Sequence, residues 1–209
     1  MKRLSRLSLL TWLLLRSIPP VPPGRLLMPA LFLSAWTVLR AFSVAEVPAF
    51  VLAGVLAQSA QLWAVLPVAV WHQRRLFARA GGAAQAALAV YLAVIALQLW
   101  QMDPAISQRV VTVYCALYVA TMLAGILGDR LFLDRFVPVS APDAVPLVTR
   151  RHILKLHAMV AVLVIVVNEI LLAMAAPLGA RVATLALLPV GLHVLFEIAL
   201  FLTLPLDDD

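Results

Sequence analysis

The chain has 209 residues, of which 64% are hydrophobic and 12% charged, and its mean hydropathy is +1.03. A soluble domain is roughly half apolar and about a quarter charged, so this composition excludes a soluble monomer and predicts an integral membrane protein. The single cysteine excludes a disulfide scaffold, and no nucleic-acid partner is expected because the net charge of +6 comes from basic residues that flank apolar runs.

Residues 1–25 are predicted to form a basic cytoplasmic arm in front of a membrane domain that covers residues 26–209. Lys2, Arg6 and Arg16 lie among leucines, which is typical of a short amphipathic helix in the plane of the membrane surface. A frayed tail is the alternative. A cleaved signal peptide is disfavoured, because Arg16 directly follows the apolar stretch and no small-x-small cleavage site appears. Prolines between residues 19 and 23 predict a stiff link into the first span.

Six apolar runs are interpreted as membrane spans, each of which needs about 20 apolar residues to cross roughly 30 Å of hydrocarbon. The first is the weakest, because Arg40 limits it. The sequence therefore predicts an all-α integral membrane protein, a bundle of six transmembrane helices. The runs are Leu27–Leu39 (extendable to Val44), Pro48–Trp71, Gly82–Trp100, Val110–Gly128, Leu156–Ala176 and Val182–Leu204.

The basic residues predict the orientation of these spans. If the chain starts inside and crosses six times, 13 of the 16 basic residues are cytoplasmic, and only Arg40, Arg109 and Arg181 are outside. Because cytoplasmic loops carry the excess of Lys and Arg, both ends are expected in the cytoplasm. The Ala-, Leu- and Arg-rich composition favours a bacterial protein, so the expected location is the inner (plasma) membrane.

Two basic segments on the cytoplasmic side are candidate contact surfaces. One is the short loop Trp71–Arg79, interpreted as a membrane-surface clamp. The other is the long loop Asp129–Lys155, a natural docking surface for other membrane proteins. Binding of anionic lipid is the alternative for both segments. The residues concerned are Arg74, Arg75, Arg79, Arg130, Arg135, Arg150 and Arg151.

The last two spans contain a candidate functional site. Glu169 and Glu197 are acidic residues inside apolar runs, Asn168 precedes the first, and His193 lies one turn before the second. Acidic side chains inside a bilayer are costly and point to function by default. Since the short turn Pro177–Arg181 makes the two spans antiparallel neighbours, we expect these four side chains to form one buried polar ladder. It is interpreted as an interhelical lock, a proton or ion path, or a cofactor or lipid site.

No motif predicts an enzyme. Ser59 and Ser107 lack the context of an activated serine, and there is no phosphate-binding glycine loop. His193 and Glu197 supply two metal ligands without a third, and the predicted depths of His193 and His157 differ too much for one haem. The sequence therefore predicts a protein without catalytic residues, metal or cofactor.

Residues 103–136 resemble the intracellular septation protein A family of bacterial inner-membrane proteins. The resemblance is carried by Val111-Thr112-Val113-Tyr114, by Ala116-Leu117, and by the basic segment Leu131–Phe136. A fifth span with an asparagine in its outer half, here Asn168, fits the same pattern, and the turn Trp71–Arg79 is similar to the family's aromatic-basic turn. Glu169 and Glu197 have no counterpart in the family's motif.

The resemblance implies a small inner-membrane protein that supports envelope synthesis and septation through contacts with other membrane proteins, without catalysis. Two other interpretations remain open. One is a small proton-coupled carrier that uses Glu169, His193 and Glu197 as a relay, and the other is an accessory subunit of a larger membrane complex. Anionic lipids and other membrane proteins are the expected partners, and a homo-oligomer is possible.

Overall fold

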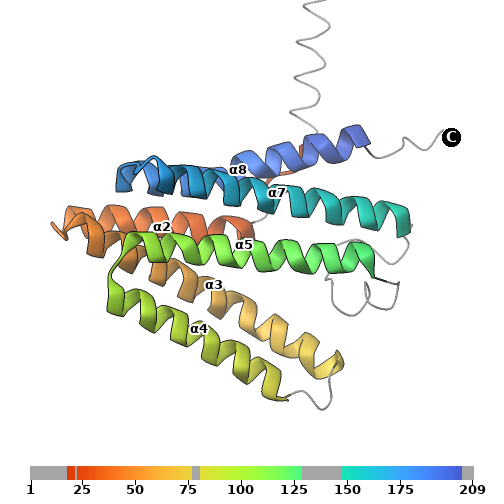
Figure 1. Cartoon of the computed structure of the whole chain (residues 1–209), viewed down its shortest axis with the longest axis horizontal. Helices are drawn as coiled ribbons and strands as arrows, with labels where there is room; N and C mark the ends of the chain where they lie inside the picture. The colour runs from red at the N-terminus through yellow and green to blue at the C-terminus, as the bar shows by residue number, and fades with distance from the viewer. Residues whose placement is uncertain (1–17, 22, 77–80, 129–146, 204–209) are drawn as a thin grey trace, which may run out of the picture.

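The structure is a computed structural model and describes residues 18–21, 23–76, 81–128 and 147–203 (Figure 1). Its regular structure within these ranges is entirely α-helical, which confirms the predicted all-α class. Each predicted apolar run corresponds to one helix. The helices are α2 (Pro23–Ala41), α3 (Glu46–Leu76), α4 (Gly81–Gln101), α5 (Pro104–Leu127), α7 (Leu147–Ala173) and α8 (Leu178–Thr203).

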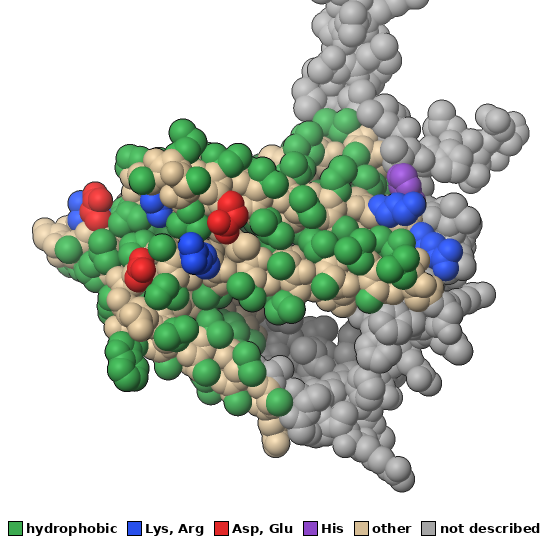
Figure 2. All heavy atoms as spheres, in the orientation of Figure 1, with side chains coloured by type: hydrophobic (Ala, Val, Ile, Leu, Met, Phe, Trp, Pro, Cys, Tyr) green, Lys and Arg blue, Asp and Glu red, His purple; other side chains and the backbone are tan. Residues whose placement is uncertain are grey.

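Four helical segments are long and apolar enough to cross a membrane. They are Glu46–Ala64, Pro104–Leu127, Arg151–Ala173 and Leu178–Leu200, whereas Leu26–Ala41 and Leu88–Gln101 are shorter apolar segments. Apolar side chains also cover the outer surface of the helices in Figure 2. A soluble protein would bury most of these side chains, so the exposed apolar surface and the four long segments indicate a membrane protein.

Two small clusters of buried side chains hold the helices together. Phe32 of α2 meets Phe50 of α3 edge to face, with ring centroids 5.4 Å apart, and Val182 of α8 packs against the same cluster. Ala53 and Ala57 are fully buried there, which lets the α2 and α3 backbones approach closely. The second cluster joins α5 to α7, which run side by side along most of their length (Figure 1); it comprises Met122, Leu154 and Ala158.

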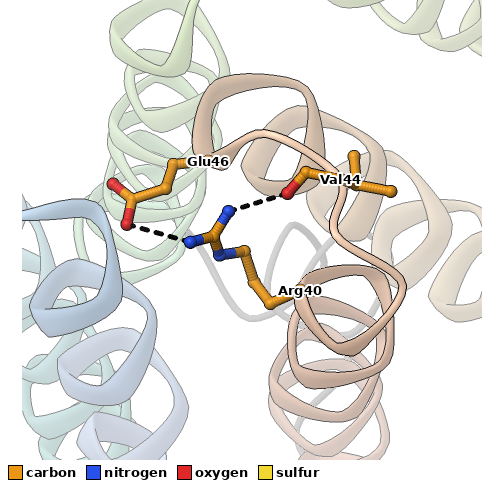
Figure 3. A network of polar contacts seen from close by, with 3 residues as sticks. All are labelled: Arg40, Val44 and Glu46. Atoms are coloured by element: carbon orange, nitrogen blue, oxygen red, sulfur yellow. Dashed lines mark hydrogen bonds and ion pairs between the residues drawn. The ribbon is translucent and has the colours of Figure 1, made fainter.

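The turn between α2 and α3 is closed by Arg40 (Figure 3). Its guanidinium donates a 2.7 Å hydrogen bond to the Val44 carbonyl and lies 3.5 Å from the Glu46 carboxylate. Ser43 in the turn has a positive φ of 61°. The first helix therefore ends at Ala41, and the predicted extension to Val44 is wrong, because the polar contacts of Arg40 favour a turn over another helical turn.

The other helix ends differ from the apolar runs because a helix can continue through polar residues. α7 begins at Leu147, so the prediction of a loop up to Lys155 is wrong for its last nine residues. Likewise α3 runs to Leu76 and includes most of the predicted loop Trp71–Arg79. Arginine, lysine and glutamine are good helix formers, so hydropathy marks the end of an apolar run and not the end of a helix.

α5 begins at Pro104, six residues before the predicted span. Asp103 is its N-cap, since the side chain accepts a 2.8 Å hydrogen bond from the Ala105 amide, and Pro104 occupies the first helical position. This start brings polar residues at positions 107–109 into the helix. The predicted in-plane helix of the N-terminal arm falls on residues 1–17, outside the described residues.

Candidate functional site

Three helix ends meet at one end of the molecule, where α5 begins, α7 ends and α8 begins (left in Figure 1). This end carries a polar network, defined here as Gln108 and Thr112 of α5, Asn168 and Glu169 of α7, and Arg181 of α8. Gln108 and Asn168 are 1% and 0% exposed, so two amide side chains are buried among apolar helices. A buried amide without hydrogen bonds is costly, and the partners of these two groups therefore decide how the helices pack.

Gln108 and Asn168 bind each other's main chain. The Asn168 Nδ2 atom donates to the Gln108 carbonyl at 2.9 Å, and the Gln108 Nε2 atom approaches the Asn168 carbonyl at 3.4 Å. Each side chain thus reaches across the α5–α7 interface to the backbone of the other helix. The reciprocal pair fixes the rotation and the axial position of α7 against α5.

The donor and acceptor groups determine which way each hydrogen bond of the network runs. The Arg181 guanidinium only donates; it gives hydrogen bonds to the Ala176 carbonyl at 2.6 Å and to Gln108 Oε1 at 3.1 Å. Gln108 must then turn its Nε2 atom toward α7. Asn168 Nδ2 also donates to the Thr112 hydroxyl at 2.8 Å, which in turn donates to Glu169 Oε1 at 2.7 Å.

The result is a directed chain of hydrogen bonds from a guanidinium on α8 to a carboxyl group on α7. A basic guanidinium stands at one end of this chain of hydrogen bonds and an acidic carboxyl group at the other, and neutral amide and hydroxyl groups lie between them. At 1.5 Å per residue, Glu169 lies about 6 Å before the end of α7 and Gln108 about 6 Å after the start of α5. The network therefore lies close to one end of the helices and not at their middle.

Asn168 and Glu169 point to different surroundings although they are neighbours in sequence. Asn168 is buried against α5, whereas Glu169 is exposed on the outer surface. One residue advances about 100° around a helix, so two adjacent side chains cannot share one face. Glu169 is therefore not packed inside the helix bundle, although its carboxyl group does accept a hydrogen bond from α5.

His193 and Glu197 make their contacts elsewhere. The His193 Nε2 atom is 3.0 Å from the Pro19 carbonyl, which can only accept, so Nε2 carries the proton of this hydrogen bond. His193 Nδ1 is 3.7 Å from Glu197 Oε1, and these side chains are 4% and 19% exposed. His193 therefore attaches the segment before α2 to α8.

The four residues do not form one continuous ladder. His193 lies about 22 Å along α8 from its start, whereas Glu169 lies about 6 Å from the end of α7 that precedes the same turn. Because α7 ends three residues earlier and α8 begins four residues earlier than the apolar runs predicted, the two residues are about 10 Å further apart along the bundle than expected. The contacts described above for the four residues thus form two separate groups, one with Asn168 and Glu169 and one with His193 and Glu197.

Sequence reasoning missed the partners on the neighbouring helices. Gln108 and Thr112 are four residues apart on α5, and that spacing of polar residues at the start of an apolar run is the signal that could have revealed them. A second amide pair joins α3 to α4, where Gln98 Nε2 donates to Gln58 Oε1 at 3.0 Å. Gln98 is 0% exposed, so this pair also serves as a contact inside the apolar bundle.

The predicted basic contact residues lie toward the other end of the helices. Arg151 donates from Nη2 to the carbonyl of Gly128, the C-cap residue of α5, at 3.3 Å. Arg74 and Arg75 lie in the last turn of α3, and Arg150 lies in the first turn of α7. Arg79, Arg130 and Arg135 lie outside the described residues. Within the described ranges, no group of three or more His, Cys, Asp or Glu side chains could hold a metal ion.

No family model, no curated protein and no solved structure matches the chain. The resemblance of residues 103–136 to the septation family therefore stays a prediction from the sequence.

A double-mutant cycle tests the side-chain contact between Asn168 and Thr112, because the hydrogen bonds between Asn168 and Gln108 end on main-chain carbonyls that an alanine keeps. We expect Thr112→Val and Asn168→Ala each to lower stability in detergent, and the two changes to couple by about 0.6 kcal/mol and at most about 1.7 kcal/mol, as found for hydrogen bonds between membrane helices. Reversible unfolding of the single and double variants measures the coupling. The matched control is Gln85→Ala, an exposed glutamine on α4, which should not couple to Asn168→Ala. Additive effects of Thr112→Val and Asn168→Ala would contradict this contact.

Proposed function

We propose that this chain is a multi-pass bacterial inner-membrane protein that supports envelope synthesis or septation by binding other membrane proteins, without catalysis. In this proposal all six helices cross the membrane, and both ends of the chain are cytoplasmic. The observation that carries it is the reciprocal Gln108–Asn168 pair, because the polar groups of α5 and α7 bind each other instead of a substrate. Such a network suits a rigid platform for partner contacts.

The charge distribution supports the six-span topology over a four-span one. If α2 and α4 did not cross, the segment after α3 would move to the outside together with Arg74, Arg75 and Arg79. Six spans keep these arginines on the cytoplasmic side, with Arg150, Arg151 and Lys155. The opposite end then carries Arg40 with Glu46, and Arg109 and Arg181 with Asp103 and Glu169, so its charges balance.

A contact in the polar network supports the family resemblance. Thr112 belongs to the Val-Thr-Val run that carries the resemblance, and Asn168 is the asparagine of the fifth span that fits the same pattern. These two residues are 56 positions apart in sequence, yet Asn168 Nδ2 donates to the Thr112 hydroxyl at 2.8 Å. Two positions singled out by one family pattern thus serve one interhelical contact, which gives that pattern a physical reason.

A proton-coupled carrier is the second candidate, and the His193–Glu197 pair favours it. The two groups are 3.7 Å apart on one face of α8, a geometry in which a proton could pass between imidazole and carboxyl. However, Glu169 lies about 16 Å from His193 along the bundle, too far for one relay of direct hydrogen bonds. This separation makes the carrier the weaker candidate.

Cysteine labelling tests the topology. In a Cys115→Ala background, we expect Ala45→Cys to react with a membrane-impermeant thiol reagent on intact cells, and Ala80→Cys to react only after the membrane is opened. Six spans with the N-terminus inside place residue 45 outside and residue 80 inside, whereas four spans with the same C-terminal side exchange the two. Labelling of Ala80→Cys on intact cells, with Ala45→Cys protected, would contradict six spans.

Affinity purification from the native membrane tests the partner contacts. We expect proteins of envelope synthesis or division at a fixed ratio to the tagged wild-type chain, and their loss from a variant with Arg135, Arg150 and Arg151 changed to Gln. Glu169→Gln is the matched control and should keep the partners, because it leaves the basic end unchanged. A partner-free preparation whose Glu197→Gln variant loses proton flux in vesicles would favour the carrier instead.

A further inference from the structure

α5 and α7 together form an outer face that carries charged side chains at one end and apolar side chains along the rest. The helices run side by side, and each exposes large apolar side chains: Val113, Tyr114 and Leu117 on α5, and Val162 and Val166 on α7. Their exposed fractions range from 43% to 69%, so described residues leave this face largely uncovered. Figure 2 shows this side of the molecule, with acidic and basic side chains set among apolar ones.

Arg109 and Glu169 occupy the charged end of this face. Both are exposed, and among the described residues neither takes part in an ion pair. Arg109 lies three residues before Thr112, on the same side of α5, and the Thr112 hydroxyl is 2.7 Å from Glu169 Oε1. Arg109 therefore lies one helical turn before the residue whose hydroxyl donates to the Glu169 carboxyl group, so both charged residues belong to the same end of the α5–α7 pair.

Arg109 and Glu169 need groups of opposite charge, or hydrogen-bond partners, if they face lipid. Both helices are long and apolar enough to cross a membrane, and Glu169 lies about 6 Å inside the end of α7. A charged group at that depth is costly unless it is paired. One leaflet of hydrocarbon is about 15 Å thick, which corresponds to about ten residues, so the apolar side chains below Arg109 and Glu169 match the acyl chains of one leaflet.

We propose that Arg109 and Glu169 bind the headgroup of a phospholipid that carries both a phosphate and a primary ammonium group, as phosphatidylethanolamine does. The planar guanidinium of Arg109 binds the phosphate oxygens, and the Glu169 carboxylate accepts hydrogen bonds from the ammonium. The acyl chains lie along the apolar face of α5 and α7. This inference depends on α5 and α7 crossing the membrane, and it is independent of the proposed protein partners.

Charge complementarity favours this lipid over an anionic one. A headgroup with a phosphate alone would satisfy Arg109 but would bring a second negative charge beside Glu169. A headgroup with an added ammonium satisfies both residues with one molecule. The site thus differs from the opposite end of the helices, where Arg151 and Lys155 are basic and no acidic residue of the described part of α7 lies near them.

Native mass spectrometry of the detergent-purified full chain tests the site, with phosphatidylethanolamine and phosphatidylglycerol of identical acyl chains as probes. We expect the wild type to retain the ethanolamine lipid preferentially, and Glu169→Gln to lower that preference about tenfold, as expected for loss of one charge-assisted hydrogen bond. Arg109→Gln should weaken retention of both lipids, because both contain the phosphate. Glu169→Asp should restore most of the preference.

Glu46→Gln is the matched control. Glu46 is an exposed carboxylate at the same end of the molecule, paired with Arg40, so its loss should leave the lipid preference unchanged. An equal preference in the wild type and in Glu169→Gln would overturn the proposal, and so would an equal loss in Glu46→Gln. Thermal unfolding of each variant identifies any that is misfolded, and Glu169→Asp keeps the test decisive if Glu169→Gln is unstable.

Discussion

The packing of this protein depends on one constraint: amide N–H groups inside apolar helices must find acceptors. Gln108 and Asn168 donate to each other's backbone, at 3.4 and 2.9 Å, and Gln58 and Gln98 bind each other's side chains, whereas the buried Oδ1 atom of Asn168 has no partner among the described residues. In a membrane, apolar contact alone gives little preference for one helix partner over another, because lipid tails are as apolar as leucine. The amide pairs therefore specify which helices are neighbours, and in which register.

The polar network also explains how charges are tolerated at one end of the molecule. Arg181 and Glu169 are not in direct contact; they are joined through Gln108, Asn168 and Thr112, which stabilise both charged ends by hydrogen bonds. Arg40 and Glu46 form a separate pair in the α2–α3 turn. The acidic and basic groups at this end are thereby balanced, while the other end keeps the excess of basic residues that the proposed orientation requires.

The sequence predicts the six helices well and their contacts poorly. The runs are recognisable because each is apolar over most of its length, but polar residues such as Arg150 and Gln108 belong to helices that continue beyond the apolar part. The partner of Asn168 depends on which face of α7 meets α5, a tertiary property that hydropathy does not contain. The same limit applies to Glu169 and His193: the apolar runs predict that the two residues are close, but a small shift of both helix ends increases their separation along the bundle to about 16 Å.

Asn168 is the only asparagine in the chain, so an NMR signal from a labelled asparagine side chain belongs to this residue without further assignment. Hydrogen exchange of that signal tests the central claim directly. The protein is labelled with side-chain ¹⁵N asparagine, placed in a lipid nanodisc and transferred to D₂O, and the exchange of the single side-chain amide signal is followed by NMR. A buried amide that donates to both Gln108 and Thr112 predicts a signal that persists long after exposed amides have exchanged. Rapid exchange of this signal, in a sample that keeps its helical content, would contradict the account.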